Sequence, residues 1–370
     1  MKREGPIVGI LVDIRGGGNK PFGPQTMFIR QLLQAGDNLG QICFAFTVND
    51  VNFDQKQIRG YRWTKGAWVR QWFSLPHVVY PRDFGVSPSK VRLRQRLMSL
   101  GCQFSSPLII GKWRSWEILS ACPELSSTLP ETRKLEGVKS LREMVGAYGS
   151  IYIKPVDGSQ GRNIARLRQI NPNGFELCYN SANGLRRFAG SISALYAPLS
   201  RLTGSRKFIM QEEIKLIRFK NGIADVRVLV QKDYDAVWKI TGKACRVGTR
   251  GAITSNISGG GHGYTVRRVL EEHFDEKHVG SILHDLDELA LMVVDALERQ
   301  IDTVGEMGID LGIDVNGKLW FIEANLRPAR YVFIQMGDMD TRMLAVRRPM
   351  EFAHYLSGYK LPPQYLRDAI

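Results

Sequence analysis

Residues 308–325 (GIDLGIDVNGKLWFIEAN) constrain the fold more than any other stretch of this chain. Apolar and polar residues alternate loosely on both sides of the dipeptide Asn316-Gly317, and Asn-Gly is the strongest short-range signal for a two-residue type I′ hairpin turn. The pattern therefore predicts two antiparallel strands, with Val315 facing Lys318 next to the turn. Because side chains alternate between the two faces of a strand, this register decides which residues meet.

Counting outward from the turn places Asp310 directly opposite Glu323, and Asp314 near the turn, opposite Leu319. Two carboxylates that face each other across an antiparallel pair repel, because their Cβ atoms lie about 4.5–5.5 Å apart, and this indicates a bound cation. Asn325 shares a face with Glu323 and adds a neutral oxygen. The set Asp310, Glu323 and Asn325 suits Mg²⁺ or Mn²⁺ bound together with substrate phosphates. The alternative is an ordinary hairpin whose acids are solvated or paired with a nearby arginine, and Asp314 is interpreted as a hairpin-end residue.

Length and composition bound the class of protein. A chain of 370 residues is expected to form two or three domains, and its hydrophobic content of 44% is typical of a soluble globular protein. It has no apolar run of the roughly 18 residues that span a membrane, and the apolar stretch near its start is too short for a signal peptide. We therefore expect synthesis in the cytoplasm and no membrane span. The net charge of +15 predicts affinity for anions, among which ATP, an acidic substrate, nucleic acid and an anionic surface all remain candidates.

The N-terminal part of the chain predicts an α/β domain. A buried strand at 7–13, a Gly-rich loop at 15–18 and a helix at 25–34 form a βα unit. Two further strands are expected at 41–48 and 77–80. The loop lacks the G-x-G-x-x-G spacing of dinucleotide-binding loops, so we interpret it as structural or as the lining of a substrate cleft.

The long connection between the last two of these strands holds three tryptophans interleaved with basic residues, namely Trp63, Trp68 and Trp72 with Arg62, Lys65 and Arg70. Such a surface could stack on nucleic acid. The alternative, which we favour, is that the connection packs onto the first domain.

A second informative stretch, residues 151–167, predicts a strand, a Gly-rich loop and a second strand. Lys154 ends the first strand, and Gly158, Ser159 and Gly161 make the loop flexible. A lysine followed by exposed backbone N–H groups is a suitable cradle for phosphates, although Gly-Ser hairpin loops are also common without one.

The remaining elements are expected from hydrophobic periodicity and turn residues. They are helices at 112–119, 138–148, 278–301 and 350–356, strands at 207–214 and 225–231, a strand pair at 237–248, and a mobile Gly-rich loop at 254–264.

The order of these features resembles the ATP-grasp superfamily. Between Lys112 and Pro328 the chain has a lysine, a strand-Lys-Pro with a Gly-Ser-x-Gly loop, a strand ending in Gln-Glu, an Asp-x-Arg, an asparagine with a Gly-rich loop, and an aspartate followed thirteen residues later by Glu-x-Asn. More narrowly, the sequence is similar to the YheC/YheD endospore coat-associated family of spore-forming bacteria. The motifs that carry this similarity are GKW (111–113), LPETRKL (129–135), YIKPVDGSQGR (152–162) and FIEANLRPA (321–329).

This resemblance implies an α/β plus α+β protein, in which an N-terminal Rossmann-like pre-ATP-grasp domain precedes a two-subdomain ATP-grasp fold. We expect the pre-ATP-grasp domain over residues 1–105, the subdomain with the phosphate loop over 106–210, and the subdomain with the metal site and C-terminal tail over 211–370. The two subdomains are expected to clasp ATP between antiparallel sheets.

The resemblance also implies roles for individual residues. The residues expected to bind the ATP phosphates are Lys112, Lys154, Gly158, Ser159 and Gly161, those expected near adenine are Gln211, Glu212 and Ile214, and Asp225 is expected near the ribose or acceptor. The metal ligands are expected to be Asp310, Glu323 and Asn325. Arg227, Arg246 and Arg327 are expected to stabilise the transferring phosphoryl group. Asn256 is expected to lie close to the acceptor.

The activity implied is that of a ligase that uses ATP and Mg²⁺ (or Mn²⁺) to activate a small-molecule or peptide carboxylate as an acylphosphate for attack by an amine or similar nucleophile. The family also implies association with the spore coat and its proteins after synthesis in the cytoplasm. Two alternatives are a structural coat component that keeps the fold without turnover, and a basic nucleic-acid-binding protein. We rank the latter last, because no nucleic-acid-binding motif is visible.

Overall fold

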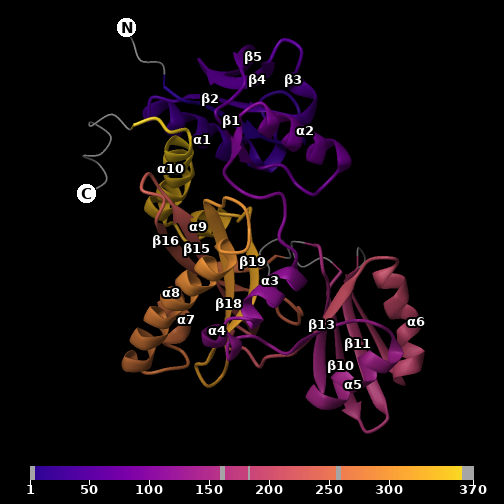
Figure 1. Cartoon of the computed structure of the whole chain (residues 1–370). Helices are drawn as coiled ribbons and strands as arrows, with labels where there is room; N and C mark the ends of the chain where they lie inside the picture. Colours follow the sequence, from indigo (N-terminus) through magenta and orange to yellow (C-terminus); the bar gives the residue numbers. More distant parts are fainter. Residues whose placement is uncertain (1–4, 159–162, 182–183, 256–259, 361–370) are drawn as a thin grey trace.

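Three β-sheets, each with its own helices, make up the molecule (Figure 1). This computed structural model describes residues 5–158, 163–181, 184–255 and 260–360. The sheet built from the N-terminal strands lies at the top of Figure 1, the sheet containing β15 and β18 lies below it, and the sheet containing β10 and β11 lies beside the latter. Among the helices of the described residues, none combines the length and the apolar content that crossing a membrane requires.

The N-terminal sheet has the strand order β3-β4-β2-β1-β6-β7, with β5 paired to β4. Its central strand β1 runs parallel to β2 and β6, as in a doubly wound α/β domain. Helices α1 and α2 cover opposite faces, because successive residues of β1 pack into two separate cores. The bounds are β1 (Ile7–Leu11), α1 (Thr26–Asn38), β2 (Ile42–Phe46), β3 (Val51–Asn52), β4 (Gln57–Thr64), β5 (Ala67–Ser74), β6 (Val78–Pro81), α2 (Pro88–Ser99) and β7 (Gln103–Phe104).

The second sheet is antiparallel, with the order β12-β11-β10-β9-β13-β8. Helices α5 and α6 pack on one face through a core of leucine, isoleucine and methionine side chains. The bounds are β8 (Thr132–Lys134), α5 (Val138–Tyr148), β9 (Ser150–Pro155), β10 (Ala165–Asn171), β11 (Gly174–Ser181), β12 (Gly184–Gly190), α6 (Ile192–Thr203) and β13 (Phe208–Glu212).

The third sheet has the order β17-β16-β15-β18-β19, with β14 paired to β15. One face carries the largest apolar core of the chain, which α8 covers together with α3 and α4 from the segment before the second sheet. The bounds are α3 (Lys112–Ser120), α4 (Pro123–Ser126), β14 (Arg218–Phe219), β15 (Gly222–Lys232), β16 (Trp238–Val247), β17 (His262–Tyr264), α7 (Val266–Leu270), α8 (Glu276–Glu298), β18 (Glu306–Ile313) and β19 (Leu319–Asn325).

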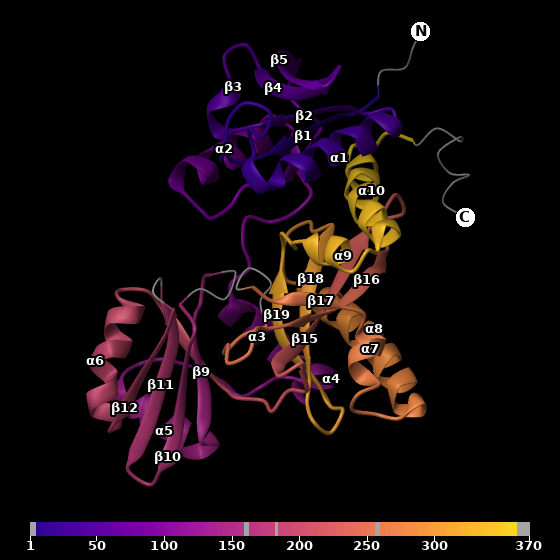
Figure 2. The ribbon, with the colours of Figure 1, turned by 180° about the vertical axis from the view of Figure 1, so that it is seen from behind.

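The C-terminal helices return to the N-terminal sheet. Helix α9 (Tyr331–Gln335) and helix α10 (Met339–Leu356) follow the third sheet, and α10 lies beside α1 in both views (Figures 1 and 2). Val346 and Met350 of α10 are fully buried in the same core as Ile29 of α1. Helix α10, in the C-terminal part of the chain, therefore packs against the N-terminal domain.

Alternation along β15 and β18 gives the third sheet one apolar face and one partly charged face. Val226 and Val228 of β15 point into the core under α8, so Asp225 and Arg227 point to the other side. Asp310 of β18 faces the same way as Arg227, its direct partner across the ladder. This charged face is where the cavities described below lie.

Two expectations about local structure are wrong, and a third is right only in part. The tryptophan-rich connection is a hairpin, β4–β5, because Lys65 and Gly66 both take the positive φ of a type I′ turn. Residues 237–248 form the single strand β16 rather than a pair. The short helix expected at 350–356 is the last part of α10, whose interior Pro349 resembles a helix start in the sequence.

The hairpin packs onto the first domain, as favoured from the sequence. The Trp63 and Trp68 rings meet edge to face at 5.3 Å, and Trp68 meets Phe22 at 5.1 Å. Trp72 is the exposed member, with 53% of its surface accessible. The strands expected at 7–13, 41–48, 77–80, 207–214 and 225–231 and the helices expected at 25–34, 112–119, 138–148 and 278–301 are confirmed within a few residues.

Candidate active site

Two cavities meet on the charged face of the third sheet. The large cavity, about 1560 Å³, lies between the N-terminal domain and the third sheet, and the small cavity, about 580 Å³, lies between the second and third sheets. Five residues line both: Lys112, Gly158, Arg246, Asp310 and Glu323. We call these five residues the junction.

The β18–β19 hairpin places two carboxylates in the junction, with Asp310 directly opposite Glu323 as predicted. The predicted turn is wrong, however. The Asp314 N–H donates to the Lys318 carbonyl, so the loop between them has three residues and ends at Gly317 with a positive φ of 86°. The Asp314 carboxylate accepts from the backbone N–H groups of Asn316 and Lys318, at 2.9 and 3.0 Å, which makes it the hairpin-end residue expected.

A β-bulge at Ile322 restores the register that the longer turn would have shifted. Before the bulge, Phe321 packs into the core under α8; after it, Ala324 does so. Without the extra residue, Glu323 would follow Phe321 into that core. The bulge is therefore what aims Glu323 and Asn325 at the cavities.

Two arginines hold the Asp310 carboxylate. Arg227 donates from Nε at 2.5 Å and from Nη2 at 3.1 Å, and Arg246 Nη2 lies 2.9 Å from Oδ2. Burial alone would raise the pKa of Asp310, but the charges of Arg227 and Arg246 outweigh it and lower the pKa below its usual value. Gly308 leaves room for this arrangement, since a Cβ there would lie 3.1 Å from Arg227 Nε. Asp310 is thus ionised and oriented.

Arg246 joins Asp310 to a second acid. Its Nε and Nη2 donate to the Asp225 carboxylate at 2.7 and 2.6 Å, and the Ser255 hydroxyl donates to the same carboxylate at 2.6 Å. Burial opposes the charge on Arg246, but Asp225 and Asp310 raise its pKa well above the ordinary value. Arg227 pairs with Asp310, and Arg246 with Asp225, through two parallel hydrogen bonds each. Such bidentate pairs hold their side chains in a fixed geometry.

Glu323 is held by a lysine from another part of the chain. Lys112, the first residue of α3, lies with its Nζ 3.2 Å from Glu323 Oε1 and donates to the Gly158 carbonyl at 2.6 Å. One amine therefore links the acidic hairpin to the start of the Gly-rich loop that follows β9.

The second predicted phosphate-binding lysine, Lys154, lies on β9 in the small cavity. Its Nζ donates to Gln211 Oε1 at 2.5 Å, and Gln211 Nε2 donates to the Thr132 hydroxyl at 3.1 Å. Burial, opposed by the charge of Glu323 and aided by that of Lys112, lowers the pKa of Lys154 to about 8. Near neutral pH this lysine is charged but easily loses its proton.

The strand end predicted to contact adenine carries two acids, and both have protein partners. The Glu212 carboxylate accepts from the Glu131 N–H at 2.8 Å. Glu213 accepts from the Ser150 and Tyr152 hydroxyls and lies 3.5 Å from Arg166. Ile214 follows them and lines the small cavity.

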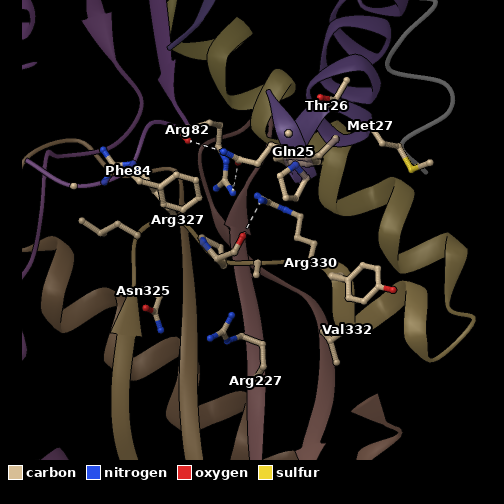
Figure 3. Close-up of a pocket in the computed structure, with 18 of the residues that line it drawn as sticks. Gln25, Thr26, Met27, Arg82, Phe84, Arg227, Asn325, Arg327, Arg330 and Val332 are labelled. Atoms are coloured by element: carbon tan, nitrogen blue, oxygen red, sulfur yellow. Dashed lines mark hydrogen bonds between the residues drawn. The ribbon is translucent and has the colours of Figure 1, made fainter. Parts of the chain in front are cut away.

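Asn325, the last residue of β19, and Arg327, two residues later, line the large cavity, and Arg227 reaches into it from β15 (Figure 3). Arg327 Nη1 donates to the Leu108 carbonyl at 2.9 Å, and its Nη2 lies 3.6 Å from the buried Asp83. Asn325 Nδ2 lies 3.3 Å from Asp310 Oδ2 and donates to it. Arg327 is thus anchored rather than free to swing.

The oxygen donors at the junction, together with Asn325 beside it, are compatible with Mg²⁺. Asp310, Glu323 and Asn325 offer carboxylate and amide oxygens on one face of the hairpin, and Mg²⁺ is usually held by one or two carboxylates together with substrate phosphates. Within the described residues, no group of three or more histidine, cysteine or acidic side chains is placed to hold a metal ion. The set of two carboxylates and an amide suits an ion that is bound together with the phosphates of a nucleotide.

Every predicted site residue in the described part of the chain lines one of the two cavities. Besides the junction, the small cavity receives Lys154, Gln211, Glu212, Ile214 and Asp225, and the large cavity receives Arg227, Asn325 and Arg327. Ser159, Gly161 and Asn256 lie outside the described residues. Sequence reasoning missed Tyr152 and Arg166 in the small cavity, and it missed Arg82, Arg330 and Arg342 in the large one. Glu213 could have indicated Tyr152 and Arg166, because an additional acid at this strand end needs hydrogen-bonding or charged partners.

Comparison with known proteins agrees with this geometry. A family model described as YheC/D-like ATP-grasp matches residues 101–356. The endospore coat-associated protein YheD of Bacillus subtilis (strain 168) is 28% identical over 364 residues, which covers 95% of this chain and 79% of that protein.

Two solved ligases share the architecture. A D-cycloserine synthetase, DcsG, superposes with a TM-score of 0.55 at 14% identity, over 95% of this chain and 99% of that one. The D-alanyl-alanine synthetase A of Vibrio cholerae superposes with a TM-score of 0.54 at 13% identity, over 96% and 98%. The chain therefore has the predicted fold, an N-terminal α/β domain followed by an ATP-grasp fold.

Proposed function

Because the chain belongs to the YheC/D-like ATP-grasp family, we propose that it is an ATP- and Mg²⁺-dependent ligase that activates a carboxylate as an acylphosphate for attack by an amine or similar nucleophile. The observation that carries the proposal is the junction, where two cavities of different character share five lining residues. A nucleotide in the small cavity and an acid in the large cavity would present their reacting ends to the same charged residues.

The small cavity has the features that a nucleotide needs. Lys112 and Lys154 supply positive charge for the phosphates, and Lys112 donates to the carbonyl of Gly158, a residue that also lines the cavity. At the other end, apolar side chains such as Trp320 and Ile322 line the cavity together with the Gln211–Ile214 strand end, where we place adenine. Asp225, between these ends, is placed near the ribose or acceptor.

The proposed reaction has two steps. A carboxylate oxygen of the acid attacks the γ-phosphorus, and ADP leaves. The nucleophile then attacks the acyl carbon and loses a proton to solvent, and phosphate leaves with the electron pair of the acyl C–O bond. Arg227, Arg246 and Arg327 point into or line the large cavity and would stabilise the charge that develops on the phosphoryl and acyl oxygens. We propose Asn256 as a further residue near the acceptor. Mg²⁺ held by Asp310, Glu323 and Asn325 would neutralise charge on the phosphates.

The binding half of the proposal is tested by calorimetric titration with Mg-ATP. We expect saturable binding, and we expect Asp310→Asn and Glu323→Gln each to weaken it at least tenfold, because each removes a charged ligand oxygen. Asp314→Asn is the matched control: it changes an acid on the same hairpin that lines neither cavity, and asparagine still caps the turn.

If Mg-ATP does not bind, or if neither substitution in the junction changes its affinity, the small cavity is not an ATP site. If Mg-ATP binds but no acid of a broad panel of amino acids, peptides and peptidoglycan precursors promotes ADP release, the chain is better described as a structural coat component that has kept the fold.

The volume of the large cavity bears on the substrate class. At about 1560 Å³ it exceeds the usual range of about 300–1000 Å³ for small-molecule pockets, so we propose a peptide or another extended acid rather than a single amino acid. The relative named as an endospore coat-associated protein supports a further proposal, that this chain is made in the cytoplasm of a spore-forming cell and acts at the spore coat with other coat proteins. Imaging of a tagged chain during sporulation tests that location.

A further inference from the structure

Three arginines from separate parts of the chain gather around one aromatic ring in the large cavity. Arg82 follows β6, Arg330 precedes α9 and Arg342 lies in α10, and their guanidinium carbons lie 5.1, 4.7 and 4.9 Å from the centroid of the Phe28 ring. All three line the large cavity, and each is at least 95% buried as a residue. We call Arg82, Arg330 and Arg342 the arginine triad. Figure 3 shows Arg82 and Arg330 converging beneath the start of α1, away from Arg227 and Asn325.

The protein neutralises only part of the charge of the arginine triad. In the described part of the chain, the acid that pairs with it is the buried Glu306, which contacts Arg330 and lies 3.5 Å from Arg82 Nη1. Tyr80 donates its hydroxyl to Glu306 at 2.7 Å, and burial raises its pKa to about 12, so it adds no negative charge near neutral pH. Three buried positive charges therefore face one negative charge.

The hydrogen bonds of the arginine triad are also incomplete. Arg342 donates to Gln31 Oε1 at 2.6 Å, and Arg82 Nη2 lies 3.5 Å from Gln25 Oε1. The Nε atoms of all three arginines are buried and have no hydrogen-bond partner among the described residues. Burial, together with repulsion from Arg330 and Arg82, lowers the pKa of Arg342 to about 10. Uncompensated buried charge is costly, and proteins keep it where a ligand completes it.

A second feature of the same end of the cavity favours an anion. Gln25, Thr26 and Met27, at the start of the thirteen-residue helix α1, line the cavity beside Arg82 (Figure 3). The N-terminus of a helix carries partial positive charge. The N–H groups of Gln25 and Thr26 donate to the Phe22 and Gly23 carbonyls of the preceding 3-10 turn, so the contribution of this helix end is its dipole rather than free N–H groups at these two residues. The helix end and the arginine triad thus add to one positive potential.

We propose that the arginine triad binds a second anionic group of the substrate, so that the acid activated at the junction carries at least one further carboxylate or phosphate. This inference rests on the proposed function and narrows its substrate class to acids with two or more anionic groups. The reacting carboxylate would lie near Arg227 and Arg246, and the second anion at the opposite end of the same cavity, beneath α1. The cavity, about 1560 Å³, is large enough to hold both groups of one molecule.

A purely structural role would not account for the arrangement. A joint between α1, α10 and the third sheet is stable when its charges are paired, and apolar residues of similar volume usually serve it as well or better. Arg348, also on α10, illustrates a structural arginine. Its Nε is likewise buried without a partner among the described residues, but it donates to the Ile240 carbonyl and the Thr241 hydroxyl and lines neither cavity. The arginine triad differs by its charge excess and its position.

The test compares matched pairs of acids by calorimetry, in the presence of Mg²⁺ and a non-hydrolysable ATP analogue that fills the small cavity. Each pair is a linear dicarboxylate and its monomethyl ester, over a series of chain lengths, and a third arm replaces one carboxylate by a phosphonate. We expect one range of lengths in which the dianion binds at least tenfold more tightly than the ester, since hydrogen bonds between charged groups are the strong ones. Whichever of the dicarboxylate and the phosphonate series binds more tightly identifies the kind of anion that the arginine triad prefers.

Variants assign that preference to the arginine triad. Arg342→Gln and Arg82→Gln should each reduce the affinity for the dianion tenfold or more and leave that for the ester unchanged. Without ligand, Arg342→Gln should lower Tm less than Arg348→Gln does. It loses one hydrogen bond, to Gln31, and relieves repulsion from Arg330 and Arg82, whereas Arg348→Gln loses two hydrogen bonds. Arg348→Gln should keep the preference for the dianion.

Equal affinity of dianions and esters at every length would overturn the inference, as would a preference that survives both substitutions in the arginine triad. A fall in Tm for Arg342→Gln as large as that for Arg348→Gln, with dianion binding unchanged, would assign the triad a structural role. Failure of the proposed function is separate: in that case the ATP analogue itself does not bind the unaltered protein.

Discussion

The amine of Lys154, in the small cavity, changes its charge close to neutral pH. Burial lowers its pKa from 10.5 to about 8, while its partner Gln211 is uncharged. The unfolded chain keeps that proton up to about pH 10.5, so this group adds stability to the unliganded fold as pH rises from about 8 to 10.5. ATP binding changes in the opposite sense, because the phosphates need the charged amine.

We therefore predict that the affinity for Mg-ATP falls above pH 8, by about fivefold to tenfold for the first pH unit. Lys154→Arg should flatten this dependence, since a guanidinium keeps its charge. Calorimetry from pH 6.5 to 9.5, in buffers of different ionisation enthalpy, measures both the affinity and the proton taken up. A flat profile for the unaltered protein, or the same slope in Lys154→Arg, would contradict the assignment.

Sequence reasoning could predict these residues because each belongs to a motif with a chemical purpose. It found Lys112, Lys154 and the acids of the hairpin, and the structure brings them to the same two cavities. The arginine pairing of Asp310 was foreseen only as an alternative to a metal, because the partner on β15 is distant in sequence. The arginine triad could not be predicted, since its members come from three elements that meet only in the folded chain.

The hairpin formed by β18 and β19 shows how a correct contact can follow from an incorrect turn. Asp310 faces Glu323 because the turn is one residue longer than Asn-Gly suggested and a bulge at Ile322 removes the same one-residue shift. Asn-Gly does not form the two-residue turn here, because the Asp314 side chain stabilises a three-residue loop by accepting from two backbone N–H groups. Nothing in the alternation of the sequence marks the bulge.

The turn offers a prediction at the scale of this element. Asp314→Ala should lower the free energy of unfolding by about 1–3 kcal/mol, because it removes the acceptor for two backbone N–H groups and the Trp320 indole N–H. Asp314→Asn, which keeps one acceptor, should cost less. Urea unfolding measures both. The turn would not depend on this side chain if the two variants were equally stable.

On the scale of the whole molecule, α10 joins the end of the chain to its beginning. We propose domain limits near residues 105 and 210, as the sequence suggested, with two segments that cross them in space. Ile118 and Leu119 of α3 belong to the core of the third sheet, and Val346 and Met350 of α10 belong to that of the N-terminal sheet. Such long-range returns could not be predicted, because the apolar pattern of α10 is interrupted by Pro349 and two adjacent arginines.

The importance of this return is testable with two methionines of α10. Met350→Ala should lower the free energy of unfolding by about 2–5 kcal/mol, because the side chain is fully buried between α10 and α1. Met343→Ala, on the same helix with the residue 50% exposed, should change it by less than about 0.5 kcal/mol. Chemical denaturation of both variants provides the measurement, and similar losses would mean that α10 does not hold the N-terminal domain.

The central claim, that a carboxylate is activated as an acylphosphate at the junction, is tested most directly by following oxygen. Acids of the panel, with two anionic groups each, are labelled with ¹⁸O in their carboxylates and incubated with the protein, Mg-ATP and an amine. Because the attacking carboxylate oxygen leaves with the phosphate, we predict ADP release that depends on the acid and ¹⁸O in the inorganic phosphate, both lost in Asp310→Asn. Phosphate released without ¹⁸O would show ATP hydrolysis by water and would contradict the proposed reaction.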